Sequence, residues 1–250
     1  MHEGYGDERY AGSAYRYNRV YRGWDTRFAG ELRVADALTT IAHAATLNRP
    51  PIWAAEWRNT NGRYPVLVYI ADSTVYQLQF GVVTSRISLA QVATDACFHD
   101  NGSGVQRLVA AEGDNGNIEI FTLAGVGDGI TGTVQRDKVA SVSGSLYGSA
   151  IPSGAARWNG ATFCPYGADP AIAANWSSIT RVGWATTDIN RIASVRGVPV
   201  YLKPEGIFLY NRALDLWENM MPAWEADPHP DNGRAVVSLG PNLVIGKGGG

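Results

Sequence analysis

The chain has 250 residues, a formal net charge of −2 at pH 7 and a hydrophobic content of 45%. This length and apolar content suffice for one large hydrophobic core or two smaller ones. The small net charge, together with the lack of a basic stripe interleaved with aromatic residues, argues against a nucleic-acid partner. Charged residues are scarce at 18%, whereas 29 Gly, 12 Tyr and 8 Trp favour many tight turns and aromatic packing between sheets.

The N-terminal octapeptide Met1–Glu8 is polar, and no apolar segment of the kind found in a secretory signal follows it. No apolar run approaches the roughly 18 residues of a membrane-spanning helix. We therefore expect synthesis in the cytoplasm and no membrane span. The two cysteines, Cys97 and Cys164, lie in different predicted blades of the β-rich region, which favours two free thiols and leaves a single bridge open.

Residues 1–35 are rich in Tyr, Arg and Gly and show no lasting helical or alternating pattern. Such a segment is typical of an extended arm that lies across a partner. An arm folded back on its own domain, or a disordered tail, is the alternative. Residues 31–47 fit a helix or an outer strand, and Pro50-Pro51 excludes the continuation of a helix. We therefore predict an N-terminal arm and connecting segment, residues 1–47, followed by a β-rich domain, residues 48–250.

Short runs of Val, Ile, Tyr and Phe between turn residues predict antiparallel strands along the whole of the second region. Residues 52–57 alternate weakly and pair plausibly with 64–70. Three further hairpins are predicted, with the strands 67–70 and 74–80, 108–111 and 118–121, and 155–158 and 161–163. In the last of these, Asn159-Gly160 predicts a two-residue turn.

The C-terminal region contains the same layout twice. Residues 192–211 hold three apolar runs, separated by Arg196-Gly197 and by Lys203-Pro204-Glu205-Gly206. Residues 235–250 repeat the first two runs and end before a third. We therefore predict a three-stranded unit followed by an incomplete copy of it.

The predicted turns recur at a nearly constant interval. Their centres lie near positions 72, 114, 159, 205 and 248, with successive spacings of 42, 45, 46 and 43 residues. Blades of β-propellers have about 40–50 residues each. The sequence thus predicts an all-β fold, a β-propeller-like array of antiparallel blades whose last blade is incomplete; a run of unrelated hairpins is the alternative.

No catalytic or metal-binding motif stands out. The glycine-rich run 125–129 lacks the Lys-Ser/Thr of a phosphate-binding loop, and Gly-x-Ser-x-Gly is absent. The four histidines are scattered, and the acidic run 112–117 is better explained by turn chemistry than by calcium. We expect no cofactor, no metal site and no enzymatic activity. Acidic residues near turn tips could form a glycosidase pair only if they converged in space; they are Asp72, Glu112, Asp114, Asp188 and Glu205.

Tryptophans are the candidate binding residues. Trp53, Trp57 and Trp158 could form platforms on which sugar rings stack. Packing between neighbouring sheets explains tryptophans at strand edges more simply. We retain these three as tentative binding residues.

Two resemblances concern the C-terminal quarter of the chain. The segments 207–211, 216–222, 232–237 and 242–246 resemble a kelch-type repeat, with Gly-Lys-Gly in place of the adjacent glycines. Residues 200–210, followed by Pro230-Asp231-Asn232-Gly233-Arg234, are similar to the propeller domains of tailed-phage virion proteins. This second resemblance, over about residues 192–250, implies a structural protein of the tail or an associated fibre with no catalytic residues.

The function expected from these observations is a non-enzymatic structural protein of a phage virion that docks on other virion proteins through a β-propeller. The alternative is a carbohydrate-binding or glycan-cleaving propeller that contacts a host-surface glycan, and a kelch-like adaptor is a third hypothesis. An incomplete last blade also predicts a fragment of a longer chain or a split propeller completed by a neighbour.

Overall fold

The structure is a computed structural model, which describes residues 24–25, 33–34, 51–57, 66–79, 82–122, 130–211, 214, 216–239 and 242–248. The chain divides into two compact units, Met1–Ala42 and His43–Gly250. In the first unit, β1 (Trp24–Asp25) pairs antiparallel with β2 (Arg33–Val34). The remainder of the predicted arm lies outside the described residues, so its division from the β-rich domain at residue 47 stays a prediction.

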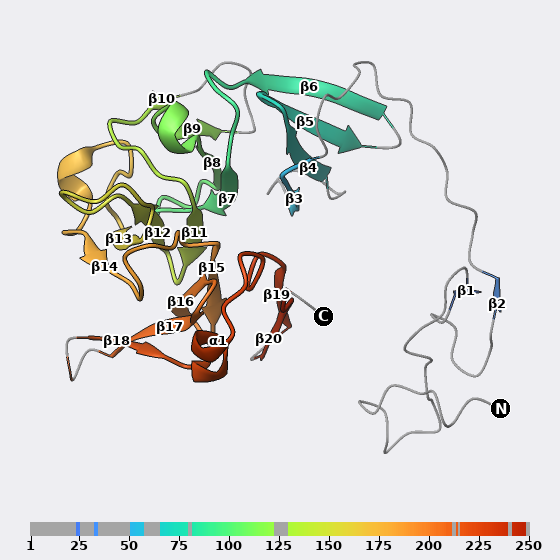
Figure 1. Cartoon of the computed structure of the whole chain (residues 1–250). Coiled ribbons are helices and arrows are strands. Elements are labelled where there is room, and N and C mark those ends of the chain that lie inside the picture. The colour runs from blue at the N-terminus through green and yellow to red at the C-terminus, as the bar shows by residue number, and fades with distance from the viewer. Residues whose placement is uncertain are drawn as a thin grey trace. The chain divides into compact units, whose positions relative to one another are not determined.

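The second unit contains five antiparallel sheets that follow one another along the chain, as Figure 1 shows. The first sheet has strands β3 (Trp53–Trp57), β4 (Val66–Ala71), β5 (Thr74–Gln79) and β6 (Val82–Ser88). The second has β7 (Asp95–His99), β8 (Arg107–Ala111), β9 (Glu119–Thr122) and β10 (Ile130–Thr131). The third has β11 (Val139–Val142), β12 (Ser145–Ala150), β13 (Gly160–Cys164) and β14 (Thr180–Arg181).

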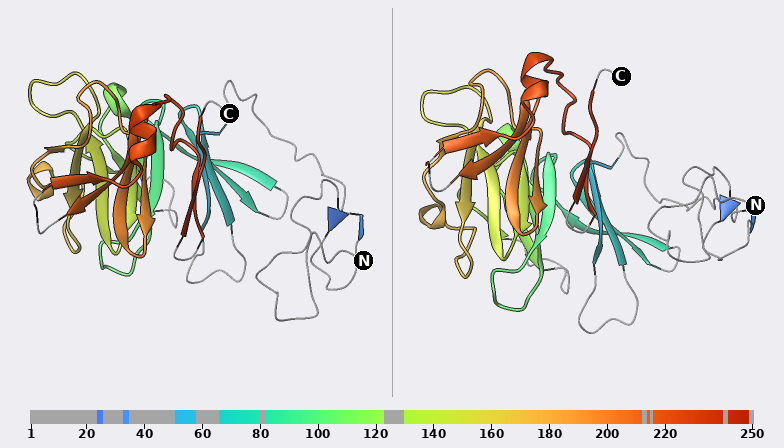
Figure 2. Two further views of the ribbon diagram at one scale, coloured as in Figure 1. Left: turned by 60° about the horizontal axis from the view of Figure 1, so that its bottom comes forward. Right: turned by 90° about the horizontal axis from the view of Figure 1, so that it is seen from below.

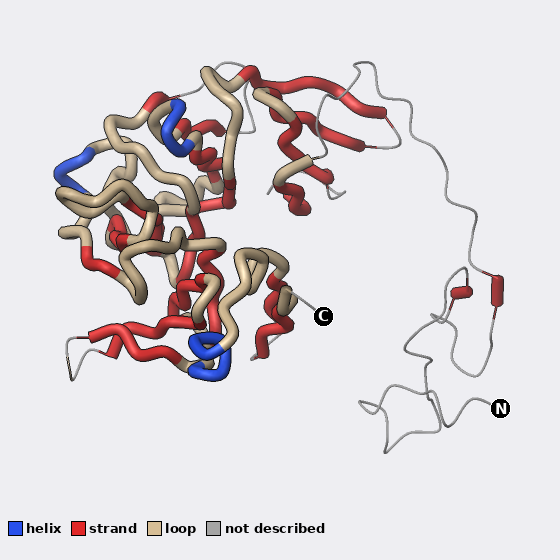
Figure 3. The backbone as a smooth tube through the Cα atoms, in the orientation of Figure 1, coloured by secondary structure: helices blue, strands red, loops and turns tan. Residues whose placement is uncertain are grey.

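The fourth sheet has β15 (Arg191–Val195), β16 (Val198–Lys203), β17 (Gly206–Asn211) and β18 (Leu216–Asn219). The fifth has β19 (Val236–Leu239) and β20 (Asn242–Ile245). Helix is confined to short segments among the described residues, as Figure 3 shows: η3 (Gly113–Asn115), η4 (Ala173–Asn175) and α1 (Pro222–Ala226). Within every sheet, strands adjacent in sequence are also adjacent in space.

The all-β, antiparallel prediction is confirmed, and so is its repeated plan. The turn centres at 72, 114, 159 and 205 all fall between the second and third strands of their sheets. The position near 248 follows the second strand of the fifth sheet. The regular spacing of the turns in the sequence therefore corresponds to equivalent positions in successive sheets.

One predicted hairpin is wrong in detail. Residues 155–158 form no strand; they belong to the connection between β12 and β13, and Gly160 opens β13 opposite Ala150. Gly160 is required there for space, since a Cβ would lie 2.4 Å from Ile179 Cγ2. The Asn159 side chain is buried and donates to the Ala185 carbonyl at 2.7 Å. Asn159 and Gly160 are thus required here for buried contacts, and they do not form a two-residue turn.

The second, third and fourth sheets are apolar on both faces. Alternate residues of a strand point to opposite faces of the sheet. The residues on one face therefore pack against the preceding sheet, and those on the other face pack against the following sheet. The third sheet shows the pattern most clearly. Its residues toward the second sheet are Val139, Leu146 and Cys164, and those toward the fourth are Ala140, Tyr147 and Ala161.

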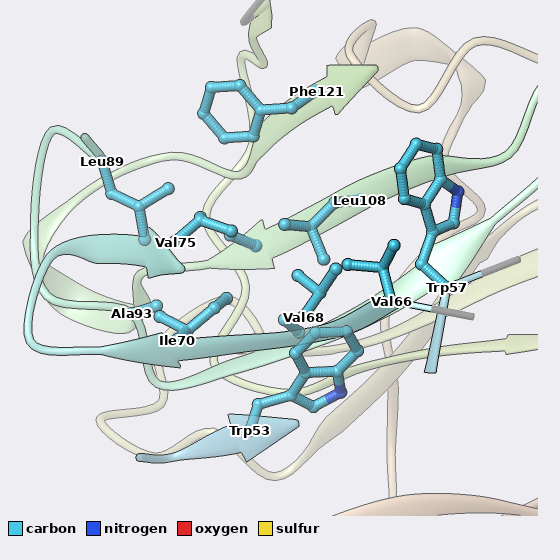
Figure 4. Packing of buried hydrophobic residues seen from close by; sticks show 12 residues of the cluster. Trp53, Trp57, Val66, Val68, Ile70, Val75, Leu89, Ala93, Leu108 and Phe121 are labelled. Carbon is cyan, nitrogen blue, oxygen red and sulfur yellow. The ribbon is translucent and has the colours of Figure 1, made fainter. Parts of the chain in front are cut away.

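Every pair of consecutive sheets encloses its own hydrophobic cluster. Figure 4 shows the cluster between the first and second sheets, where Trp53 and Trp57 lie among aliphatic side chains. Phe98 meets the Trp53 ring edge-on, with 5.1 Å between centroids. The core of this unit is therefore a series of interfaces between consecutive sheets. Figure 2 shows the ribbon of these sheets from two further sides.

From the second sheet to the fifth, the first strands of neighbouring sheets contact one another: β7 with β11, β11 with β15 and β15 with β19. A buried carboxylate links the first three of these strands. Asp95 on β7 accepts a hydrogen bond from the Val139 amide on β11 at 3.1 Å. It also pairs with the Arg191 guanidinium on β15 at 2.8 Å. Burial raises the pKa of Asp95, an effect that the charge of Arg191 only partly offsets. The contact therefore links the second, third and fourth sheets at one point.

A second kind of hydrogen bond recurs in three sheets. It joins the linker that leads into the first strand of a sheet to the loop that follows the second strand of that sheet. Glu112 accepts from the Gln91 amide at 3.0 Å, and Glu205 accepts from the Trp184 amide at 2.8 Å. In the fifth sheet, Asn232 accepts from the Gly248 amide at 2.9 Å. Polar side chains thus bind the second, fourth and fifth sheets to the linkers that precede them.

We expect Asp95→Ala to lower the free energy of unfolding by about 2 kcal/mol, because the buried Val139 amide loses its acceptor and Arg191 its partner. Urea unfolding followed by tryptophan fluorescence measures this change. Arg157→Ala is the matched control, since its pair with Asp188 is largely exposed and is worth less than about 1 kcal/mol. Equal losses in both variants would contradict a linking role for Asp95.

Candidate binding site

A groove with a volume of about 420 Å³ lies between the third and fourth sheets, whose strands are labelled in Figure 1. Ligand sites are commonly concave, of about 300–1,000 Å³, and lined by apolar and aromatic side chains. The lining comes from β12, β13, β14 and the end of the connection before β14 on one side, and from β16, β17 and β18 on the other. Its residues are Tyr147, Ala161, Thr162, Phe163, Ser177, Ser178, Thr180, Val198, Pro199, Tyr201, Tyr210 and Trp217.

Two cross-strand aromatic pairs form the walls of the groove. Tyr147 on β12 is opposite Phe163 on β13, and their rings stack at 5.6 Å with an interplanar angle of 27°. Tyr210 on β17 is opposite Trp217 on β18, with ring centroids 5.2 Å apart. Direct cross-strand neighbours have Cβ atoms within about 5 Å, so strand register alone brings each pair together.

Tyr201 on β16 forms the floor. Its ring meets Trp217 edge-on at 5.1 Å, and its hydroxyl donates to the Thr162 carbonyl at 3.4 Å. Burial raises the pKa of Tyr201. Tyr201 therefore stays neutral and joins the two walls across the sheet interface.

Hydroxyl groups line one rim and hold it in place. Ser177 Oγ accepts from the Phe163 amide at 3.0 Å and donates to the Ser178 carbonyl at 3.2 Å. Thr162 Oγ1 donates to the Ser177 carbonyl at 2.8 Å, and Trp217 Nε1 donates to Thr180 Oγ1 at 3.3 Å. These bonds fix the position of the rings before any ligand arrives.

The groove suits recognition. Its twelve lining residues comprise five aromatic residues, three small or aliphatic apolar ones and four with hydroxyl side chains. The rings of Phe163 and Tyr210 are more than one-third exposed, so their surfaces are available to a ligand. The arrangement offers stacking and apolar contact.

The three tryptophans predicted as binding residues lie elsewhere. Trp53 and Trp57 are buried between the first and second sheets. Trp158 is buried in the connection between β12 and β13, where its Nε1 donates to Asp114 Oδ1 at 3.1 Å and its amide donates to Asp188 Oδ1 at 2.8 Å. Each indole has packing partners of its own, and a joint sugar-binding role for the three stays a prediction.

The acidic residues near turn tips mostly have structural partners. Asp114 and Asp188 flank Trp158, and Glu205 forms a fully buried ion pair with Lys203 at 3.0 Å. Lys203 also donates to the Val182 and Trp184 carbonyls. These bonds assign Asp114, Asp188 and Glu205 to the packing of linkers and loops.

Glu112 and Glu119 form the acidic pair closest to a catalytic arrangement. Both are buried, and they accept hydrogen bonds from the adjacent amides of Gln91 and Ala90. Burial raises the pKa of each, and the charge of Glu112 raises that of Glu119 further. The structure thus shows both carboxylates bound to one linker, with their ionised forms disfavoured.

Within the described part of the chain, no group of three or more His, Cys, Asp or Glu residues is placed to hold a metal ion. No helix there is long and apolar enough to cross a membrane. Cys97 and Cys164 are both free thiols. His99 is the buried last residue of β7, and its Nδ1 contacts Ser141 Oγ at 3.0 Å.

Sequence reasoning missed all four wall residues of the groove. A usable signal existed for Tyr210 and Trp217, which flank the gap between the segments 207–211 and 216–222. None existed for Tyr147, because the predicted hairpin paired Phe163 with residues 155–158. Aromatic residues at directly opposed positions of a hairpin are a recognised pairing. The sequence alone did not show that the two pairs would face each other across a sheet interface.

Comparison with known proteins gives distant structural likenesses only. No protein-family model and no curated protein matches the sequence. The extracellular domain of a hybrid two-component system of B. thetaiotaomicron superposes with a TM-score of 0.49 and 13% identity, covering 76% of this chain and 26% of that one. Two structures of a second extracellular domain from this organism give TM-scores of 0.24 and 0.22, with 9% and 8% sequence identity. Both superpositions cover 76% of this chain and 31% of the other chain.

We expect Trp158→Ala to lower the free energy of unfolding by about 3 kcal/mol, because it empties a buried site and removes a side-chain hydrogen bond. Trp184→Ala, at a 37% exposed tryptophan, should cost clearly less. Thermal and urea unfolding measure both variants. A Trp158→Ala protein as stable as its parent would favour a ligand-binding role for this indole.

Glu119→Gln should reduce the pH dependence of stability. A carboxyl with a raised pKa binds protons more readily when folded, so the free energy of unfolding falls as pH rises from the unfolded pKa through the folded one. The introduced glutamine stays neutral at every pH and can still accept from Ala90, so the variant should be the more stable protein above that window.

Urea unfolding between pH 4 and pH 8 tests this expectation. Asp227→Asn, at a side chain that is 81% exposed, is the control and should leave the pH profile unchanged. A Glu119→Gln profile as steep as that of the parent would contradict the assignment.

Proposed function

We propose that this chain is a non-enzymatic interaction protein built on a β-propeller-like domain, and that the groove between the third and fourth sheets is its docking surface. The observation that carries the proposal is the pair of facing aromatic walls, formed by Tyr147 with Phe163 and by Tyr210 with Trp217. Aromatic residues are enriched at the centres of protein interfaces, where they supply much of the binding energy.

The propeller assignment is supported by the repeated plan of the sheets. Four consecutive four-stranded meanders, with first strands that contact one another from the second sheet onward, match the plan of successive blades. The two-stranded fifth sheet fits the incomplete last blade expected from the sequence. The virion setting, with other virion proteins as partners, belongs to the same proposal and is supported by the resemblance of residues 192–250.

Carbohydrate binding is the second candidate, because exposed rings beside hydroxyl groups can also stack on a sugar. We rank it lower for a chemical reason. Sugar hydroxyls need several polar partners, whereas Ser177 Oγ, Thr162 Oγ1 and Thr180 Oγ1 already bond within the protein. The groove therefore offers more apolar area than hydrogen-bonding capacity.

Parallel binding screens against a displayed peptide library and a glycan array test the proposal. Phe163→Ala and Tyr210→Ala each remove a partly exposed wall ring and should weaken a true ligand about tenfold or more. Tyr166→Ala removes a ring that is 65% exposed and outside the groove, and should leave binding unchanged.

Peptide or protein binding that depends on both wall rings would support docking through the groove. Glycan binding that depends on both wall rings would favour carbohydrate binding as the function. Glycan cleavage would contradict the proposal that the protein is not an enzyme. Ligands that bind all three variants equally would place the docking surface elsewhere.

A further inference from the structure

The interface between the second and third sheets is covered by a segment of the chain itself. The connection between β13 and β14 spans fifteen residues, 165–179, and packs against residues that follow β10. Ala171 is buried in that interface, and its carbonyl accepts from the Thr133 amide at 3.0 Å and from the Thr133 hydroxyl at 3.1 Å. A segment of this chain thus fills the outer part of a sheet interface.

The covering segment has a distinct chemistry. Pro170 and Ala171 are buried, and the Pro170 carbonyl accepts from Trp176 Nε1 at 2.9 Å. The Trp176 ring lies 4.1 Å from the Arg136 guanidinium carbon. The contacts with the interface are therefore made by a proline, a small residue, an aromatic ring and backbone carbonyl groups. The segment itself folds into turns and η4, and its Asp169 accepts from the Ala171 amide at 3.0 Å.

The equivalent connection of the fourth sheet is much shorter. Between β17 and β18 it has four residues, 212–215, a length that a hairpin turn consumes. The groove is lined by Tyr210 and Trp217, on the two strands that this connection joins, and lies at the next interface along the array. The interface between the second and third sheets is covered by a segment of the chain. The groove lies at the corresponding place in the interface between the third and fourth sheets.

We propose that the groove accepts an uncharged, proline-containing segment of another protein chain, at a place that residues 168–176 of this chain fill in the preceding interface. This inference rests on the proposed docking function and names its ligand class. The lining matches such an occupant, because none of its twelve residues is charged and proline-rich segments dock into aromatic-lined grooves. A segment in the polyproline conformation also loses little entropy on binding.

Titration calorimetry of the full chain with two capped probe peptides, deca-proline and (Ala-Pro)5, tests the inference. Both should bind with sub-millimolar Kd, and Phe163→Ala should raise Kd about tenfold. Ser178→Trp introduces a bulky ring at an exposed rim residue and should abolish binding while the fold, checked by circular dichroism, is retained. Tyr166→Ala, outside the groove, should bind like the parent.

A neutral glucose oligosaccharide is titrated in parallel, to separate failure of this inference from failure of the docking function. Oligosaccharide binding that Ser178→Trp blocks, without peptide binding, would overturn the peptide assignment and leave the groove as a recognition site. Peptide binding that is unchanged in Phe163→Ala and Ser178→Trp would overturn the inference, as would the absence of binding by both peptides.

Discussion

Burial of both faces of the middle sheets is the constraint on which the rest of this structure depends. A sheet with one solvated face can use polar residues at every second position, but the second, third and fourth sheets have neighbours on both sides. Both alternating sets must therefore be apolar or small, as Val139 and Ala140 on β11 are. The scarcity of charged residues and the abundance of glycine and aromatic residues follow from this demand.

Because apolar contacts alone are not directional, the alignment of the sheets requires more specific interactions. The polar residues that remain inside provide them, at the first strands through Asp95 and at the linkers through Glu112 and Glu205. Buried polar groups are costly unless they have partners, and these carboxylates each accept at least one backbone hydrogen bond. The groove inherits its fixed geometry from this framework, since its walls belong to two sheets held in register.

Much of this architecture could be predicted from the sequence, because strand and turn signals are local. The runs around Tyr201 and Phe208 and the turn at Glu205 are contiguous in the chain, and their spacing recurs in the preceding sheets. The hairpin assigned to Asn159-Gly160 failed because buried side-chain contacts, and not the local turn preference, decide that connection. The choice between helix and strand for residues 31–47 falls largely outside the described residues.

The candidate site was harder to predict, because it depends on contacts between sheets. Trp53, Trp57 and Trp158 drew attention by residue type, yet a sheet buried on both faces has core positions for tryptophan on either side. Phe163 and Trp217 are 54 positions apart and face the same groove only after two sheets pack. Periodicity within one sheet carries no information about which aromatic pairs will meet across an interface.

The salt bridge between Asp95 and Arg191 has a consequence for how such an array could evolve. Repeat proteins commonly grow or shrink by duplication or loss of whole units, since each unit contacts only its immediate neighbours. This bridge instead reaches over the third sheet, from the second to the fourth. Inserting or deleting a unit between its two ends would separate the charges, so changes in repeat number should be tolerated at the margins of the array and selected against in its middle.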